Sequence, residues 1–228
     1  MSHMESNLQA ELEACLRFEM LLAELSSKFI NLPASELDSQ IDNAQRQVCQ
    51  CLGFDLAVLW RASGPARDNM VLTHFYRSFD GPPVPDRMSA RDHFPWFMQQ
   101  ALAGRLVAIS SLEQLPPAAA RDREVFACFG IKTTLNIPLS TGGGPVLGVV
   151  SFNDVKQERE WPEAQVTRLK LVAQIFANAI ARTHTEEALR DSEQRPPLAA
   201  DSAGAGLWSL DLATGVFGSR IKPANCSS

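Results

Sequence analysis

DREVFACFGIKTTLNIPLSTGGGPVLGVVSFND, residues 122–154, decides the fold because it joins a helix end, a tight turn and two strands in direct succession. Gly130 provides the left-handed backbone position at which helices often end. Apolar residues then alternate with Lys132, Thr134 and Asn136, which predicts a strand with one more polar face. After the glycines of residues 141–144, residues 146–152 are apolar on both faces, as in a strand in the middle of a sheet. The stretch holds no nucleophile–base pair or metal-ligand cluster, which favours a binding or signalling module over an enzyme.

The flanking segments predict further helices and strands. Apolar spacing predicts helices over residues 5–30 and 36–51, and Gly53 ends the second. Residues 54–62 and 70–78 predict a hairpin, residues 93–104 a short helix, residues 105–112 a brief strand, and residues 115–130 a helix preceded by prolines. The longest predicted helix spans residues 161–195. Hairpin connections make the sheet largely antiparallel, so we expect an α+β sandwich with five to six strands.

The first predicted helix carries an apolar face. Its members recur at helical spacing, with charged residues outside the face: Leu8, Leu12, Cys15, Leu16, Met20, Ala23 and Phe29.

Composition excludes several classes of function. A chain of 228 residues suits one domain with appendages, and its net charge of −5 without a Lys/Arg patch argues against a nucleic-acid partner. No apolar run approaches the roughly 20 residues that cross a bilayer, and the polar N-terminus lacks a signal peptide. The five scattered cysteines suit reduced thiols. We therefore expect a cytoplasmic protein, and we interpret residues 1–4, MSHM, as a vector remnant.

Four pieces of the chain, in the right order, resemble the GAF family of small-molecule sensor domains: residues 102–124, 123–139, 142–154 and 161–182. The resemblance covers residues 24–182. It implies a twisted antiparallel sheet with the N- and C-terminal helices on one face and a pocket, roofed by short helices, on the other. On this basis residues 5–30 form an N-terminal helix and residues 31–183 the GAF domain.

The chain beyond residue 183 resembles the start of a second domain. Residues 184–197 look like a signalling-helix linker, residues 198–220 like a truncated PAS start, and residues 221–228 form a tail that fits neither pattern. PAS domains usually follow GAF domains in bacterial sensor histidine kinases. The resemblance therefore implies a parent protein of a two-component system, with downstream PAS and kinase domains outside this chain.

Candidate ligand-binding residues come from the polar strand face and the predicted short helices, because small-ligand sites are mostly apolar with a few polar groups. The candidates are Lys132, Thr134, Asn136, Trp96, Phe97, Phe126 and Phe129. The alternative is that the aromatic residues are ordinary core and that Lys132 is solvated. His74 and His93 are isolated histidines, which favours structural roles over metal binding.

Known GAF specialisations can be compared with these residues. Arg121 stands where phytochrome-like members carry the cysteine that attaches a bilin, so we expect no covalent bilin. Only residues 152–154, FND, approach the pattern of cyclic-nucleotide-binding members. Cys128 alone lacks the partner thiol that the free methionine sulfoxide reductases of this fold require. The ligand and any cofactor stay open.

The long C-terminal helix predicts self-association, because an apolar seam that outlasts its domain usually pairs with a copy of itself. We expect a homodimer through the terminal helices; the alternative is one helix covering the sheet of a monomer. Three hypotheses follow. The first is a non-catalytic GAF sensor that binds a small molecule and relays the signal through the dimeric helix. The second is a dimerisation and relay module without a ligand, and the third, more remote, is an enzyme like the methionine sulfoxide reductases.

Overall fold

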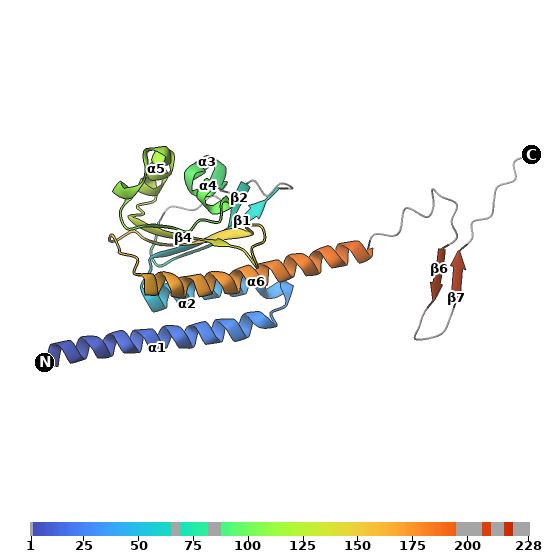
Figure 1. The fold of residues 1–228 in the computed structure, drawn as a ribbon, viewed down its shortest axis with the longest axis horizontal. Coiled ribbons are helices and arrows are strands. Elements are labelled where there is room, and N and C mark those ends of the chain that lie inside the picture. Colours follow the sequence, from blue (N-terminus) through green and yellow to red (C-terminus); the bar gives the residue numbers. More distant parts are fainter. Residues whose placement is uncertain (1, 65–68, 82–87, 195–206, 211–216, 221–228) are drawn as a thin grey trace, which may run out of the picture. The chain divides into compact units, whose positions relative to one another are not determined.

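The computed structural model describes residues 2–64, 69–81, 88–194, 207–210 and 217–220 (Figure 1). The chain divides into two compact units, Met1–Thr183 and His184–Ser228. Of the second unit the structure describes the end of the last long helix and a pair of short antiparallel strands, β6 (Leu207–Leu210) and β7 (Phe217–Arg220). Most of the residues interpreted as a PAS start, and all of the tail, lie outside the described residues.

A five-stranded antiparallel sheet forms the centre of the first unit, which confirms the predicted α+β fold. Its strands lie in the order β2 (Asn69–Arg77), β1 (Leu56–Ser63), β5 (Gly148–Asp154), β4 (Thr133–Leu139) and β3 (Val107–Ile109). Hairpins join β1 to β2 and β4 to β5. Gly130, at a φ of 70°, turns the chain into β4, as the sequence predicts.

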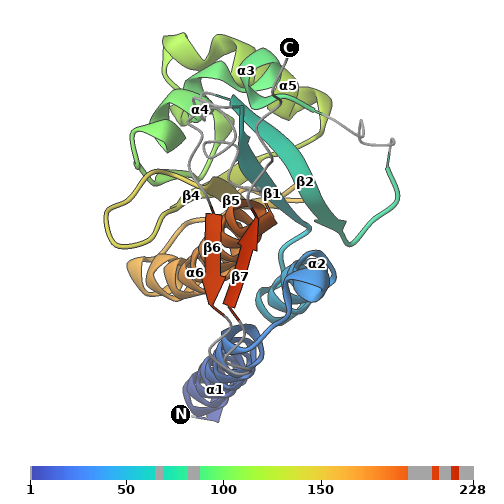
Figure 2. The ribbon, with the colours of Figure 1, turned by 90° about the vertical axis from the view of Figure 1, so that its right-hand side faces the viewer.

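Helices α2 (Leu37–Leu52) and α6 (Glu163–Gln194) cover one face of the sheet, and α1 (Ser2–Ile30) packs beneath them on the side away from the sheet (Figures 1 and 2). Alternate strand residues point into this helix face and are almost fully buried: Ala57, Leu59, Leu135, Ile137, Val150 and Phe152. Gly53 ends α2 in the left-handed conformation. None of the described helices is both long and apolar enough to cross a membrane.

The opposite, pocket face is covered by short helices: α3 (Ala90–His93), α4 (Pro95–Leu102) and α5 (Ala120–Cys128), with 3₁₀ turns before α5. The helix predicted over residues 93–104 is split at Phe94, because a residue that precedes proline is disfavoured in helical conformation. The buried carboxylate of Asp122, on α5, accepts hydrogen bonds from the backbone N–H groups of Phe97 (3.0 Å) and Trp96 (3.3 Å). It therefore caps α4 and joins the two helices of the roof.

Helix α1 has two apolar faces where the sequence pattern predicts one. Phe18, Leu25 and Phe29 are buried within the helix-side core. Leu12, Leu16 and Met20, which belong to the predicted face, are 58%, 54% and 73% exposed and lie on the other side of the helix. The predicted face is therefore largely the outward one, because apolar spacing does not distinguish packing on the same chain from packing on another.

Candidate functional site

Two adjacent cavities lie between the sheet and the short helices. The first encloses about 60 Å³ and is lined by Val58, Trp60, Met70, Ala90, Phe94, Phe97, Met98, Ala101, Phe126, Ile131, Asn136, Val149, Ser151 and Asn153. The second encloses about 90 Å³ and is lined by Leu56, Val58, Trp60, Leu72, Phe75, Arg77, Phe79, Met88, Phe94, Cys128, Phe129 and Ile131. Their common wall is formed by Val58, Trp60, Phe94 and Ile131.

Aromatic rings wall the cavities. Phe94 meets Trp60 edge-on, with ring centroids 5.8 Å apart, and lies 4.9 Å from Phe126. Phe97 stands perpendicular to Phe126 at 5.0 Å. These are favourable aromatic geometries, so the rings pack against one another around the space that they leave.

Polar side chains from β4 and β5 form the floor of the first cavity. Ser151 donates from Oγ to Oδ1 of Asn136 (2.6 Å), and Asn136 donates from Nδ2 to Oγ1 of the buried Thr134 (2.9 Å). The next polar residue on the same face of β5, Asn153, is 1% exposed. Its Oδ1 has no hydrogen-bond partner among the described residues. A polar floor under an aromatic roof suits a ligand with an apolar body and one polar end.

The predicted site residues are placed differently from one another. Phe97, Phe126 and Asn136 line the first cavity and Phe129 lines the second. Thr134 lies one hydrogen bond behind Asn136.

Lys132 and Trp96 are not among the described lining residues. Lys132 precedes β4, is exposed, and donates from Nζ to the backbone oxygen of Lys156 (2.7 Å). Trp96 packs edge-on against Phe97, at 5.0 Å. Lys132 thus lies just before the start of β4 and Trp96 lies beside Phe97, and both are outside the described lining of the two cavities.

Sequence reasoning missed Trp60, Phe94, Ser151 and Asn153. The signal was present on β5, where Ser151 and Asn153 alternate with buried apolar neighbours. Strand periodicity places both polar residues on one face.

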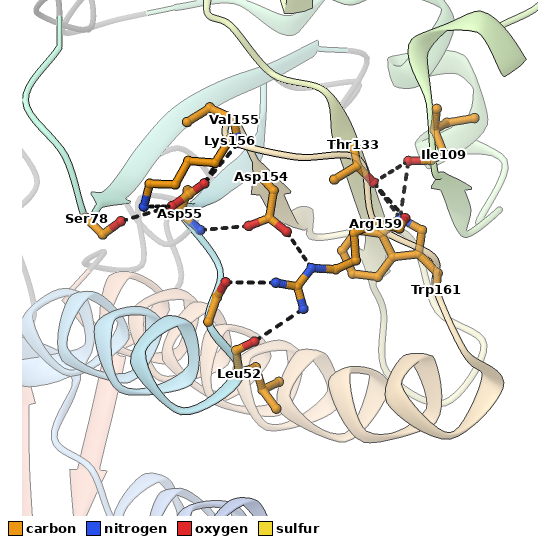
Figure 3. Close-up of polar contacts among 11 residues, drawn as sticks. Leu52, Asp55, Ser78, Ile109, Thr133, Asp154, Val155, Lys156, Arg159 and Trp161 are labelled. Atoms are coloured by element: carbon orange, nitrogen blue, oxygen red, sulfur yellow. Dashed lines mark hydrogen bonds and ion pairs between the residues drawn. The ribbon is translucent and has the colours of Figure 1, made fainter. Parts of the chain in front are cut away.

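A clamp of polar contacts fixes the segment between β5 and α6 (Figure 3). The carboxylate of Asp154 accepts a hydrogen bond from the backbone N–H of Asp55 (3.1 Å) and pairs with the guanidinium of Arg159. Arg159 also donates to the backbone oxygen of Gly53 (2.9 Å), just past the end of α2. Its guanidinium lies 4.8 Å over the Phe54 ring, a cation–π distance. Strand β5 and the end of α2 are thus held by one side chain from the segment that leads into α6.

Two further contacts complete the clamp. The buried carboxylate of Asp55 accepts from the backbone N–H groups of Val155 and Lys156, both at 3.2 Å, and from Nζ of Lys156 at 2.5 Å. Burial alone would raise the pKa of Asp55, but the hydrogen bonds and charge of Lys156 outweigh it, so the pKa is lowered. Trp161 donates from Nε1 to Oγ1 of Thr133 (3.0 Å). The start of α6 is therefore tied to β4 and β5.

The described histidine and cysteine side chains either lie outside the cavities or line them without a second such residue beside them. His74 is buried on the helix face, its Nε2 is 3.3 Å from the carboxylate of Asp38, and burial lowers its pKa. Cys128 lines the second cavity, while burial on the helix face raises the pKa of Cys49. Within the described part of the chain, no cluster of three His, Cys, Asp or Glu residues could hold a metal ion.

Comparison with known proteins agrees with this architecture. A family model for the GAF domain matches residues 36–180. Among solved structures, the GAF domain region of a putative membrane protein from Geobacter sulfurreducens is 18% identical, with a TM-score of 0.52 over 64% of this chain and 93% of that one. The phycocyanobilin-bound GAF domain of a cyanobacterial phytochrome is 16% identical, with a TM-score of 0.60 over 74% and 96%.

An enzyme of the same fold is also similar. The free methionine-R-sulfoxide reductase from Neisseria meningitidis is 16% identical, with a TM-score of 0.55 over 76% of this chain and 93% of that one. At these identities the likeness concerns the fold alone. The comparison with curated protein sequences gives no match. The GAF family model matches more than half of this chain, so the chain belongs to the GAF domain family.

Proposed function

We propose that this chain is a non-catalytic GAF sensor module that binds a small molecule between the sheet and the short helices. The observation that carries the proposal is the pair of aromatic-walled cavities, the first of them with a polar floor, on the face away from the terminal helices. GAF domains are generally regulatory or sensor domains, and apolar cavities with a few converging polar groups are typical ligand sites.

The clamp supplies a route from the pocket to the long helix. Asn153 lies on the floor of the first cavity, and the next residue, Asp154, pairs with Arg159 ahead of α6. A ligand that shifts the end of β5 would therefore act on the start of α6. If α6 can take two arrangements, the ligand can shift the balance between them only by the difference between its affinities for the two.

We also propose that the module acts as a homodimer through its terminal helices. The exposed stripe of Leu12, Leu16 and Met20 on α1, and the exposed Leu189 near the end of α6, support this proposal. Side chains of this kind at helical spacing are what paired helices bury. In the parent protein, which we place in the cytoplasm, the dimer would pass the signal to PAS and kinase domains of a two-component system.

The sensing proposal is tested by filling the first cavity. Ala101 lines it on α4, whereas Ala103, just past the end of the same helix, is exposed. Native mass spectrometry of the purified protein and a thermal-shift panel of small molecules identify a bound compound. We expect Ala101→Leu to lose that compound and Ala103→Leu to keep it. Because overpacking costs about 1–3 kcal/mol, the unfolding of both variants is measured. A bound compound that Ala101→Leu retains would place its site elsewhere.

The dimer is tested by sedimentation at micromolar concentration. Met20→Glu puts a charge in the middle of the exposed stripe, and Arg17→Glu puts the same side chain on the flank of the helix. We expect a dimer for the wild type and Arg17→Glu, and a monomer for Met20→Glu. A wild type that sediments only as the 25.0 kDa monomer contradicts the proposal.

A second candidate function is a dimerisation and relay module without a ligand. The small volumes of the cavities, about 60 and 90 Å³, favour it, since pockets for drug-sized ligands measure about 300–1,000 Å³. A dimer that binds no compound in either assay would support it. The remote alternative is a sulfoxide reductase, which requires a second thiol beside the first. Among the described cysteines, Cys128 alone lines a cavity. A direct assay of free methionine sulfoxide reduction tests that alternative.

A further inference from the structure

The side-chain oxygen of Asn153 is the most unusual polar atom of the pocket. The residue is 1% exposed, and its Oδ1 accepts no hydrogen bond from the described residues. Leaving a buried acceptor unpaired costs about 1–3 kcal/mol, and such atoms in native proteins call for a specific explanation. Since Asn153 lines the first cavity, a bound molecule is the natural donor.

The neighbouring polar groups do not need such a donor. Oδ1 of Asn136 already accepts from Ser151, and Nδ2 of Asn136 donates to Thr134. These two bonds fix the Asn136 amide within the floor. Asn153 is therefore the floor residue whose acceptor is left without a partner among the described residues.

The charge of the lining restricts the ligand further. Among the described residues, none that lines the first cavity has a charged side chain, and Arg77 is the charged one that lines the second. Arg77 donates to the backbone oxygen of Gly81 (2.7 Å) and lies over the Phe75 ring, at 5.7 Å. An ion in the first cavity would be buried without an opposite charge, which is strongly unfavourable. The ligand that suits this cavity is neutral.

The volumes limit the ligand to about one ring. The cavities of about 60 and 90 Å³ are separated by side chains that line both of them, including Phe94. An apolar cavity of about 150 Å³ binds benzene. A rotation of a shared wall side chain would join the two spaces and admit a molecule of that size.

We propose that the pocket binds a neutral, single-ring compound that donates one hydrogen bond, from an O–H or N–H group, to Oδ1 of Asn153. The ring packs among Phe94, Phe97 and Phe126. This inference rests on the proposed sensing function and adds to it the chemistry of the ligand.

Phenol and toluene test the proposal, because they differ only by a hydroxyl in place of a methyl group. Their affinities for the wild type and for Asn153→Leu, which keeps the side-chain size, are measured by ligand-observed NMR titration. We expect the ratio of phenol to toluene affinity to fall about fivefold or more in Asn153→Leu, which corresponds to one net hydrogen bond of about 1 kcal/mol. Asn178→Leu, an exposed site on α6, should leave the ratio unchanged. Benzoate, which is charged, should not bind.

A second measurement avoids dependence on the folding of the variant. In the wild type, the side-chain amide signals of Asn153 should shift on addition of phenol and stay in place with toluene. If both compounds bind and the affinity ratio is the same in Asn153→Leu, the inference is overturned while the sensing proposal stands. If neither probe binds but the purified protein carries a charged or larger compound, the inference alone fails. If no compound binds in any assay, both proposals fail.

Discussion

The two faces of the sheet differ in how completely they are filled. On the helix face, Leu59, Val150 and Phe152 have no exposed surface and pack within a continuous core under α2 and α6. On the pocket face, Trp60, Val149 and Asn153 border open cavities beneath short helices. The same strands thus supply a packed layer on one side and an incompletely filled one on the other. The difference indicates that stability resides mainly in the helix face, while the pocket face leaves space for the proposed ligand.

The contrast is sharpest on β5, where consecutive residues alternate between the faces. Phe152 belongs to the helix-side core, Asn153 to the pocket floor and Asp154 to the clamp. A displacement at the pocket floor is therefore one residue away from the contact that positions α6. Strand β5 therefore provides a short covalent path from the pocket floor to the clamp.

The largest expected effect comes from the helix face. Phe152 is fully buried, and its ring lies 5.5 Å from that of Phe54. Phe152→Ala should lower the free energy of unfolding by about 3–5 kcal/mol, because the packed core leaves a cavity. Phe129→Ala, at a half-buried position of the pocket face, should cost clearly less. Urea unfolding monitored by circular dichroism measures both. Equal losses would contradict the difference in packing.

The roof of the pocket offers the next test. Asp122→Ala removes the buried carboxylate that accepts from the backbone N–H groups of Trp96 and Phe97. We expect a loss of roughly 2 kcal/mol, the order of a lost helix cap or of buried donors left unpaired. Amide hydrogen exchange at residues 96 and 97 should accelerate while exchange in α2 stays slow. Asp92→Ala, at an exposed carboxylate of α3, is the control. Uniformly faster exchange would mean that the roof does not open separately.

The sequence predicted the helix face of the sheet better than the pocket face. Strand and helix periodicity predicted the sheet, its antiparallel connections and the long helices, because burial on the helix face enforces regular apolar spacing. The pocket was predicted less well. Phe97, Phe126 and Asn136 are among the described lining residues and Trp96 and Lys132 are not, because a short roof helix and a strand end do not fix which side chains point inward.

The clamp was missed for a related reason. Asp55, Asp154 and Arg159 lie far apart in the sequence or on a loop, and they meet only after the sheet has formed. No local periodicity marks a loop residue that bonds to the end of a distant helix. On α1, the sequence predicted the apolar stripe but did not predict that the stripe is exposed.

The clamp predicts a specific dependence of stability on pH. Because the pKa of Asp55 in the folded chain is lowered from its ordinary value of 3.8, the folded state binds fewer protons than the unfolded one near that pH. The stabilisation is complete above 3.8 and is lost as the pH falls through the folded pKa. At pH 7, Asp55→Asn should be less stable than the wild type by about 1–2 kcal/mol.

The measurement is the difference in urea unfolding free energy between the wild type and Asp55→Asn at several pH values from 7 to 3. This difference should shrink as the pH falls. Asp92→Asn, at an exposed carboxylate, should show a small and constant difference. A constant difference for Asp55→Asn would mean that the charge of this carboxylate does not stabilise the clamp.

The smallest effect tests the comparison of the two faces most directly, because it uses neighbouring residues of the same type. Val150 is fully buried on the helix face, whereas Val149 lines the first cavity. Val150→Ala should cost about 2 kcal/mol, and Val149→Ala about 1 kcal/mol less, since a side chain beside empty space makes fewer contacts. Val149→Ala also enlarges the cavity, so it should bind toluene more tightly than the wild type, while Val150→Ala should not. If the two variants lose equal stability and neither gains affinity, the faces are equally well packed and the small cavities of the pocket face do not act as a binding site.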